Sequence, residues 1–283
     1  MTGTSSRRIR SGAFAVLATL STLFGAALLV VLLWSVFKQG AGRLSWEFLK
    51  SFPSRYPERS GIYSALMGSI WVIVITGLIT VPVGVAAAIY LEEFTRRKTR
   101  FVEFVQLNIS NLAGVPSIVY GLLGLAVFVR WMDLGRSILA GALTMALLIL
   151  PTVIIVSQEA LKAVPRSFRE ASLALGATEW QTIHRQVLPS AASGIMTGII
   201  LSLSRAMGET APLIVVGAVA YVARVPKGLG DTFTVLPIQI YNWISEAKEG
   251  FHVAAAAAII VLLVVLLAMN SIAIWLRSRA RKA

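Results

Sequence analysis

The amino-acid sequence predicts an all-α, polytopic membrane protein with six transmembrane helices. Of its 283 residues, 57% are hydrophobic and only 14% are charged, and the mean hydropathy is +0.78. A soluble domain carries about 25% charged residues, so most of this surface must face lipid. Six apolar stretches are each long enough to cross a hydrocarbon core of about 30 Å. We expect all six to be helical, because a backbone in lipid must satisfy its own hydrogen bonds.

The first stretch follows three arginines and is too long for the core of a cleaved signal peptide, so we expect an uncleaved anchor. In the third stretch, Gln106, Asn108 and Asn111 move the expected start of the span to near Ala113. The six predicted spans are Ala13–Phe37, Ile62–Leu91, Phe104–Val129, Ser137–Ser157, Ala191–Val222 and Phe251–Leu276.

The basic residues predict the orientation of these spans. Of the 26 Lys and Arg residues, 15 lie on the side of the two termini and 10 lie on the other side. Tight basic clusters at 96–100 and 277–282 stand close to span ends, which places both termini in the cytoplasm. A pI of 10.7 would also suit nucleic-acid binding, but these residues flank apolar runs, where anionic lipid attracts them. We therefore expect membrane lipid and no nucleic acid as a partner.

Metal and enzyme chemistry find little support in the sequence. It has no cysteine, and its two histidines, His184 and His252, are far apart, so we expect no metal site. An intramembrane enzyme would need convergent catalytic groups such as paired Asp or Ser with His, and the spans offer none. We therefore assign no catalytic residue.

The segment 158–190 is too long and polar for a simple connector. It predicts a helix from Pro165 to Ala174 that ends at Gly176. A second short helix is expected after Thr178 as N-cap, ending before Pro189. A helix–Gly–helix loop of this kind suits the groove of a partner protein, whereas the alternative is a solvated amphipathic loop.

The spacing in this segment resembles the "EAA" loop of ABC importer permeases. Glu-Ala-Ser stands where that pattern has Glu-Ala-Ala, and the hydrophobic position before Leu-Pro is Ile183 or Val187. In that family the loop docks into a separate ATPase subunit. The residues assigned to an ATPase-coupling loop on this resemblance are Phe168, Glu170, Ala171, Ser172, Gly176, Leu188 and Pro189.

No phosphate-binding Gly-x-x-x-x-Gly-Lys-Ser/Thr loop occurs in the sequence. We therefore expect this chain to be a transporter subunit without its own ATPase site, binding no cofactor itself. If ATP drives it, ATP and Mg²⁺ belong to a partner subunit.

Arg205 and Glu209 are the only charged residues well inside a predicted span. Placing an arginine at mid-membrane costs a few kcal/mol or more, so such residues normally face a bundle interior or a wet cavity. The guanidinium is planar and permanently charged, which suits bidentate binding of phosphate. With the hydroxyls of Ser202 and Thr210, the pair predicts a station on an anion translocation path. A structural ion pair that locks helices together is the alternative.

Two segments extend the family resemblance. Ser204–Leu213 reads SRAMGETAPL, and Gly114–Leu122 reads GVPSIVYGL, with Pro116, Ser117, Tyr120 and Gly121 in the third predicted helix. Together with the EAA-like loop, they resemble the phosphate-specific ABC transporter permeases of the PstA type across 60–277. The resemblance implies a type I ABC importer permease fold, transport of inorganic phosphate, and a bacterial plasma (inner) membrane.

The same resemblance implies an assembly. A PstC-type permease would complete the pore as a heterodimer, two PstB-type ATPases would bind below, and a PstS-type protein would deliver phosphate. We expect residues 1–60 to hold the N-terminus, anchor helix and first periplasmic loop, 61–277 the permease domain, and 278–283 a basic tail.

Two alternatives stay open at this point. An ABC importer permease for another oxyanion, such as sulfate, molybdate or phosphonate, fits the charged pair equally well. An ion-coupled secondary transporter would often carry more spans and internal repeats. The role of segment 223–250, as a gate, a receptor contact or solvent-facing structure, also stays open.

Overall fold

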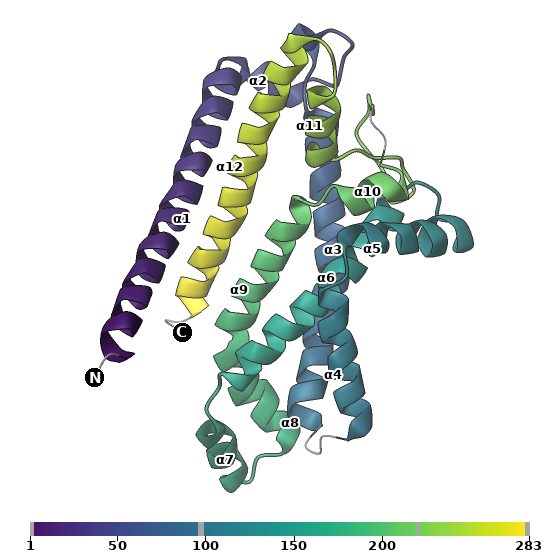
Figure 1. The fold of residues 1–283 in the computed structure, drawn as a ribbon. Helices are drawn as coiled ribbons and strands as arrows, with labels where there is room; N and C mark the ends of the chain where they lie inside the picture. Colours follow the sequence, from purple (N-terminus) through teal and green to yellow (C-terminus); the bar gives the residue numbers. More distant parts are fainter. Residues whose placement is uncertain (1–2, 96–98, 219–220, 281–283) are drawn as a thin grey trace.

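The computed structural model describes residues 3–95, 99–218 and 221–280, and these ranges contain helices and no strand (Figure 1). The helices are α1 (Gly3–Gly40), α2 (Trp46–Lys50), α3 (Tyr63–Ile89), α4 (Arg100–Ala113), α5 (Ser117–Gly124), α6 (Ile138–Lys162), α7 (Arg166–Ala174), α8 (Glu179–Thr182), α9 (Leu188–Met207), α10 (Ala211–Val216), α11 (Leu236–Ile244) and α12 (Glu249–Ala280). Three π-helical turns extend them, at Tyr90–Phe94, Leu125–Trp131 and Ile183–Val187.

Five of the helical stretches are long and apolar enough to cross a membrane, and the bent pair of α4 and α5 raises the number to six. The predicted first, second, fourth and sixth spans correspond to α1, α3, α6 and α12. The prediction of a multi-pass, all-α membrane protein is therefore confirmed for the described residues. Parts of the two basic clusters that oriented the predicted spans, residues 96–98 and 281–282, lie outside the described residues.

The third predicted span is wrong as a single straight helix. It consists of α4 and α5, whose axes are bent by 102° at a break over residues 114–116. Pro116 lacks the N–H that a continuous helix would use, and its ring disfavours helical geometry at Val115. The break thus has a local cause that apolar periodicity does not reveal.

The fifth predicted span is also wrong in its second half. Helix α9 ends at Met207, and after a short turn α10 runs only to Val216. Gly217 then ends α10 with φ of +104°, in the left-handed region that glycine tolerates. Residues 219–220, within the predicted span, lie outside the described residues. Arg205 therefore occupies the last turn of a helix rather than its middle.

The loop between α6 and α9 follows the prediction up to its last step. Helix α7 ends at Ala174, and Gly176 follows it with φ of +84°. Thr178 caps α8 through a capping box with Gln181. The expected end before Pro189 is wrong, because the chain passes from α8 through a π-helical turn directly into α9. A π turn lets a helix continue where an α turn would clash with a proline.

Glycines let the central helices α3, α6 and α9 approach closely. A Cβ on Gly84 of α3 would lie 2.7 Å from the Val153 side chain of α6. Two glycines of α9 pack on α6 in the same way, with Gly194 against Ala160 and Gly198 against Val156. Small residues are the usual contact for helices in lipid, where apolar burial drives little association. These three helices hold the rest of the molecule in place.

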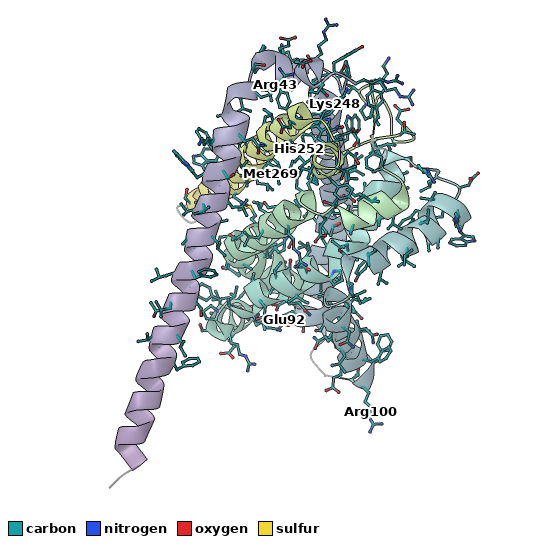
Figure 2. The ribbon with its side chains drawn as sticks, turned by 45° about the horizontal axis from the view of Figure 1, so that its top comes forward. Arg43, Glu92, Arg100, Lys248, His252 and Met269 are labelled. Atoms are coloured by element: carbon teal, nitrogen blue, oxygen red, sulfur yellow. The ribbon has the colours of Figure 1, made fainter. Side chains whose placement is uncertain are left out.

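Helix α1 lies at one edge of the molecule beside α12 (Figure 2). Its most apolar stretch has no buried residue within this chain. It meets α12 closely at Gly40, where an added Cβ would come within 2.5 Å of the Ala256 and Ala257 backbone. Gly40 therefore fixes how α1 meets α12.

We expect Gly40→Ala to push α1 off α12, because the contact is with backbone atoms that cannot rotate away. Overpacking of this kind costs about 1–3 kcal/mol. The measurement is the thermal unfolding midpoint in detergent. Gly25→Ala on the same helix is the matched control, since nothing lies within 4 Å of its added Cβ. Equal midpoints for the two variants would contradict the close contact.

Candidate functional site

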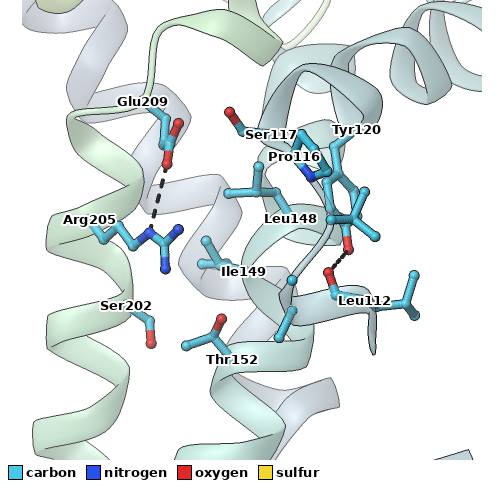
Figure 3. Close-up of a pocket in the computed structure, with 13 residues that line it drawn as sticks. Leu112, Pro116, Ser117, Tyr120, Leu148, Ile149, Thr152, Ser202, Arg205 and Glu209 are labelled. Atoms are coloured by element: carbon cyan, nitrogen blue, oxygen red, sulfur yellow. Dashed lines mark hydrogen bonds and ion pairs between the residues drawn. The ribbon is translucent and has the colours of Figure 1, made fainter. Parts of the chain in front are cut away.

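A small cavity lies where the two helix breaks meet (Figure 3). Its volume is about 260 Å³. The break between α4 and α5 forms one wall, α6 forms a second wall, and the end of α9 with its following turn forms the third. Pockets for drug-sized ligands usually have about 300–1,000 Å³, so this cavity suits a small ion with little accompanying water.

Arg205 and Glu209 face this cavity as a loose ion pair. The Nε atom of Arg205 lies 3.7 Å from Oε1 of Glu209, and the two side chains are 68% and 20% exposed. Arg205 stands in the last turn of α9, where the carbonyl end of the helix favours a positive charge. Glu209 does not belong to the same helix as Arg205, because α9 has ended at Met207. The turn after Met207 still brings the two charges together.

The start of α5 lies beside the same cavity. Pro116 and Ser117 line the cavity, so the N-terminal, positive end of this helix stands next to it. Tyr120 lines it too, and its hydroxyl donates a hydrogen bond of 2.8 Å to the carbonyl oxygen of Leu112. This bond joins α5 to α4 across the break and helps to fix the 102° bend.

Three of the four residues predicted for the translocation path line the cavity, and these are Arg205, Glu209 and Ser202. Three residues of the family-like segment line it as well, and these are Pro116, Ser117 and Tyr120. Thr210 does not line it and instead stands at the N-cap position of α10. Gly121 does not line it either, because it packs on α10, where an added Cβ would come 2.8 Å from the Pro212 Cα atom. Thr152 of α6 lines the cavity and was missed, since its hydroxyl in an apolar helix is an ordinary feature in sequence.

The predicted coupling loop forms an exposed helical hairpin at the far end of the bundle, where Figure 1 shows α7 and α8. Its apolar side chains are largely uncovered: Phe168 is 50% exposed, Leu175 is 89% exposed and Trp180 is 61% exposed. The Ser172 and Thr182 hydroxyls lie 2.9 Å apart and tie α7 to the end of α8. Both candidates for the hydrophobic position, Ile183 and Val187, are buried, so they anchor the hairpin rather than meet a partner.

Sequence reasoning missed a second Arg–Glu pair beside this hairpin. Arg169 of α7 binds Glu93 through two parallel contacts, one of them 3.0 Å from Nε to Oε2. The hydrogen bonding of the Arg169 guanidinium to the Glu93 carboxylate, which accepts from it, raises the pKa of Arg169 above its usual value. The two residues are 76 positions apart, and nothing in the local pattern joins them.

Segment 223–250 has a structural role at its centre. The backbone N–H groups of Ile138 and Leu139, at the start of α6, donate to the carbonyl oxygens of Asp231 and Leu229. The Asp231 carboxylate accepts from the backbone of Lys227 and Gly228, which lowers its pKa. The turn therefore satisfies amides that a helix start leaves unpaired.

The comparisons with known proteins agree with this architecture. Residues 80–282 match the family of binding-protein-dependent transport system inner membrane components. The chain is 36% identical over 189 residues to the probable ABC transporter permease protein YqgI of Bacillus subtilis, covering 67% of this chain and 64% of that protein. It is 35% identical over 248 residues to the phosphate transport system permease protein PstA 1 of Mycobacterium tuberculosis, covering 86% and 80%.

A solved structure supports the fold. The chain superposes with a TM-score of 0.66 on a chain of a bacterial ABC transporter involved in the import of the acidic polysaccharide alginate. The match covers 97% of this chain and 96% of the other, at 17% identity. At this identity the likeness concerns the fold alone.

Gly121→Ala tests the packing that shapes the cavity. The added methyl group would meet the Pro212 backbone, so we expect a loss of about 1–3 kcal/mol from overpacking. Gly114→Ala is the control, because its nearest neighbour would lie at 3.4 Å and its backbone is not left-handed. Thermal unfolding in detergent is the measurement. A Gly121→Ala protein as stable as Gly114→Ala would contradict the contact between α5 and α10.

Proposed function

Since this chain belongs to the family of binding-protein-dependent transport system inner membrane components, we propose that it is the permease subunit of an ATP-driven importer for inorganic phosphate. Within that proposal it forms half of the translocation path. The observation that carries it is the cavity at which Arg205, Glu209 and the N-terminus of α5 meet. Relatives named as phosphate transport system permeases, at about 35% identity over most of the chain, support the choice of anion.

The chemistry of the cavity favours a small oxyanion. A guanidinium offers several N–H donors in one plane, and a helix N-terminus adds backbone N–H groups and positive potential. The hydroxyl groups of Ser117, Ser202 and Thr152 stand around the same space. An anion with four oxygens can accept from several of these donors at once, whereas an apolar or cationic solute cannot accept hydrogen bonds from them.

The same geometry favours release. Arg205 holds Glu209 by a single contact of 3.7 Å, and most of its side chain is exposed. A transported ion must bind strongly enough to enter and weakly enough to leave. Glu209 competes with the anion for the guanidinium, so we propose that it lowers the affinity of Arg205 and speeds departure.

Glu209 also gives the cavity a means of selecting phosphate. An ionised carboxylate only accepts hydrogen bonds, and at neutral pH phosphate still carries a proton that it can donate. Sulfate and molybdate carry no such proton, so their oxygens would meet the carboxylate as like charges. Repulsion of the wrong ligand is a common source of specificity. A phosphonate can also carry a proton near neutral pH and donate it to Glu209. Among the alternative substrates, phosphonate is therefore the one that Glu209 discriminates least from phosphate.

The energy source belongs to other chains in this proposal. The hairpin of α7 and α8 offers exposed Phe168 and Leu175 to an ATPase that binds ATP and Mg²⁺. A PstC-type permease, two PstB-type ATPases and a PstS-type binding protein would complete the assembly in a bacterial plasma membrane. Both termini then lie in the cytoplasm. Residues 1–60 form the anchor region, 61–277 form the permease domain and 278–283 form a basic tail.

We expect Arg205→Ala to lower ATP-driven phosphate uptake roughly tenfold or more, because hydrogen bonds to charged groups contribute about 1.5–3 kcal/mol. The measurement is uptake of labelled phosphate by proteoliposomes that hold the whole complex. Arg100→Ala is the matched control, since Arg100 is exposed at the far end of α4 (Figure 2). Unchanged uptake by an assembled Arg205→Ala complex would make the pair structural and place the anion path elsewhere.

Glu209→Gln should relax the choice of anion. The amide keeps the size of the side chain but removes the negative charge and adds an N–H donor. In the same vesicles we expect sulfate and molybdate to compete with phosphate more strongly than in the wild type. Competition curves with each anion provide the measurement. Identical curves for both proteins would show that Glu209 does not select the substrate.

A further inference from the structure

The contact between Arg169 and Glu93 differs in geometry from two other ion pairs in the described part of the chain, Lys162–Glu159 and Arg205–Glu209. The side chain of Glu93 is 8% exposed and that of Arg169 is 20% exposed, and the two groups meet as a bidentate fork. By comparison, Lys162 and Glu159 make one contact of 2.9 Å with side chains 46% and 65% exposed. Salt screens the attraction within a shielded pair only weakly, and two parallel hydrogen bonds hold both side chains in one orientation. An exposed pair with a single contact has neither property.

A single guanidinium joins three elements at this point. Besides Glu93, at the end of the π-helical turn after α3, Arg169 donates to the carbonyl oxygens of Leu161 and Val164, at 3.0 and 2.8 Å. Leu161 belongs to the last turn of α6, whose carbonyl groups have no partner within the helix. Arg169 thus fastens α7 to the ends of both α3 and α6.

The backbone connects α7 to α6 and α9, but not directly to α3. Along the chain, α7 is joined to α6 through residues 163–165 and, through the Gly176 turn and α8, to α9. Helix α3 is not a neighbour of α7 in sequence. Only a through-space contact can therefore carry a movement of α7 into α3.

From α3 the contacts continue to the cavity. Gly84 packs on Val153, and the hydroxyl of Thr76 donates to the carbonyl oxygen of Ala142, so α3 and α6 are in close contact at two levels. Leu148, Ile149 and Thr152 of α6 form the wall opposite Arg205. The ion pair and this wall are thus joined by tightly packed helices.

We propose that Arg169 and Glu93 are positioning residues that transmit the movement of the α7–α8 hairpin into α3 and hence into the wall of the translocation cavity. The inference rests on the proposed function, because the hairpin moves only if an ATPase binds it. Without the pair, the hairpin keeps its connections to α6 and α9 but loses this link to the end of α3, so hydrolysis continues with less of the anion delivered. The pair therefore determines how efficiently ATP hydrolysis is coupled to transport.

The test is the number of phosphate ions taken up per ATP hydrolysed by the complete complex in proteoliposomes. Arg169→Lys keeps the charge but loses the fork, and Glu93→Gln keeps the size but loses the charge. We expect each to lower the ratio at least about fivefold, the lower end of typical coupling between sites, while ATP hydrolysis continues. Glu159→Gln, in the neighbouring exposed pair, is the control and should leave the ratio unchanged.

A cross-link separates coupling from folding. The chain has no cysteine, so Glu93→Cys with Arg169→Cys places the only two thiols at this contact. We expect a low ratio before and a restored ratio after treatment with a short bifunctional thiol reagent. Since the same assembled molecules are compared, a folding defect cannot produce this rescue.

The outcomes distinguish the two proposals. An unchanged ratio in Arg169→Lys and Glu93→Gln, or loss of assembly in both, would overturn the role in coupling and leave the pair as a structural contact. A cysteine pair that regains no coupling when cross-linked would overturn it as well. Absence of ATP-dependent phosphate uptake by the wild-type complex would instead contradict the proposed function.

Discussion

An amide that leaves a helix inside a membrane must find another partner within the protein, and this constraint organises the molecule. Irregular backbone at membrane depth is tolerated where protein buries it or where it lines a wet cavity. Here two irregular segments, 114–116 and 208–210, converge on one cavity. Their amides turn back on the preceding helices, with Gly114 donating to Asn111, Val115 to Leu112, and Gly208 to Arg205. The two helix breaks form walls of the cavity, and the cavity in turn is a place where irregular backbone is tolerated at membrane depth.

Two Arg–Glu pairs among the described residues show how geometry separates a loose contact from a tightly held one. Arg205 touches Glu209 once, at 3.7 Å, and remains 68% exposed. Arg169 donates two hydrogen bonds to the Glu93 carboxylate and two more to backbone carbonyl oxygens, and it is largely shielded from solvent. A guanidinium that makes four such bonds cannot exchange partners without leaving several groups unpaired. One that makes a single long contact can exchange its partner for an anion. The residue types are the same, and their surroundings give them different roles.

The sequence predicted what depends on local composition and missed what depends on distant contacts. Long apolar runs located α1, α3, α6 and α12, and Thr178 and Gly176 marked the hairpin correctly. The end of α9 was missed because the apolar sequence continues to Val222. A turn that is surrounded by protein can have the same apolar composition as a membrane-spanning helix. Pro189 was taken as a stop, but the preceding π-helical turn accommodates it. Arg205, Glu209 and Ser202 were named because charges inside an apolar span are unusual, and the α5 residues were named from a family-like segment. Thr152 and the pair of Arg169 with Glu93 needed coordinates, since no local pattern connects residues 76 apart.

The positions of the glycines explain why a distant hairpin can act on the cavity at all. Gly84, Gly194 and Gly198 bring α3, α6 and α9 into contact without intervening long side chains. Flexible side chains at such an interface would absorb a small displacement by changing rotamers. Contacts through backbone and short side chains cannot, so α6 must follow when a neighbour shifts. Tightly packed interfaces transmit strain rather than dissipate it. A displacement that enters α3 at Glu93 therefore arrives at Ile149 and Thr152, where the cavity wall faces Arg205.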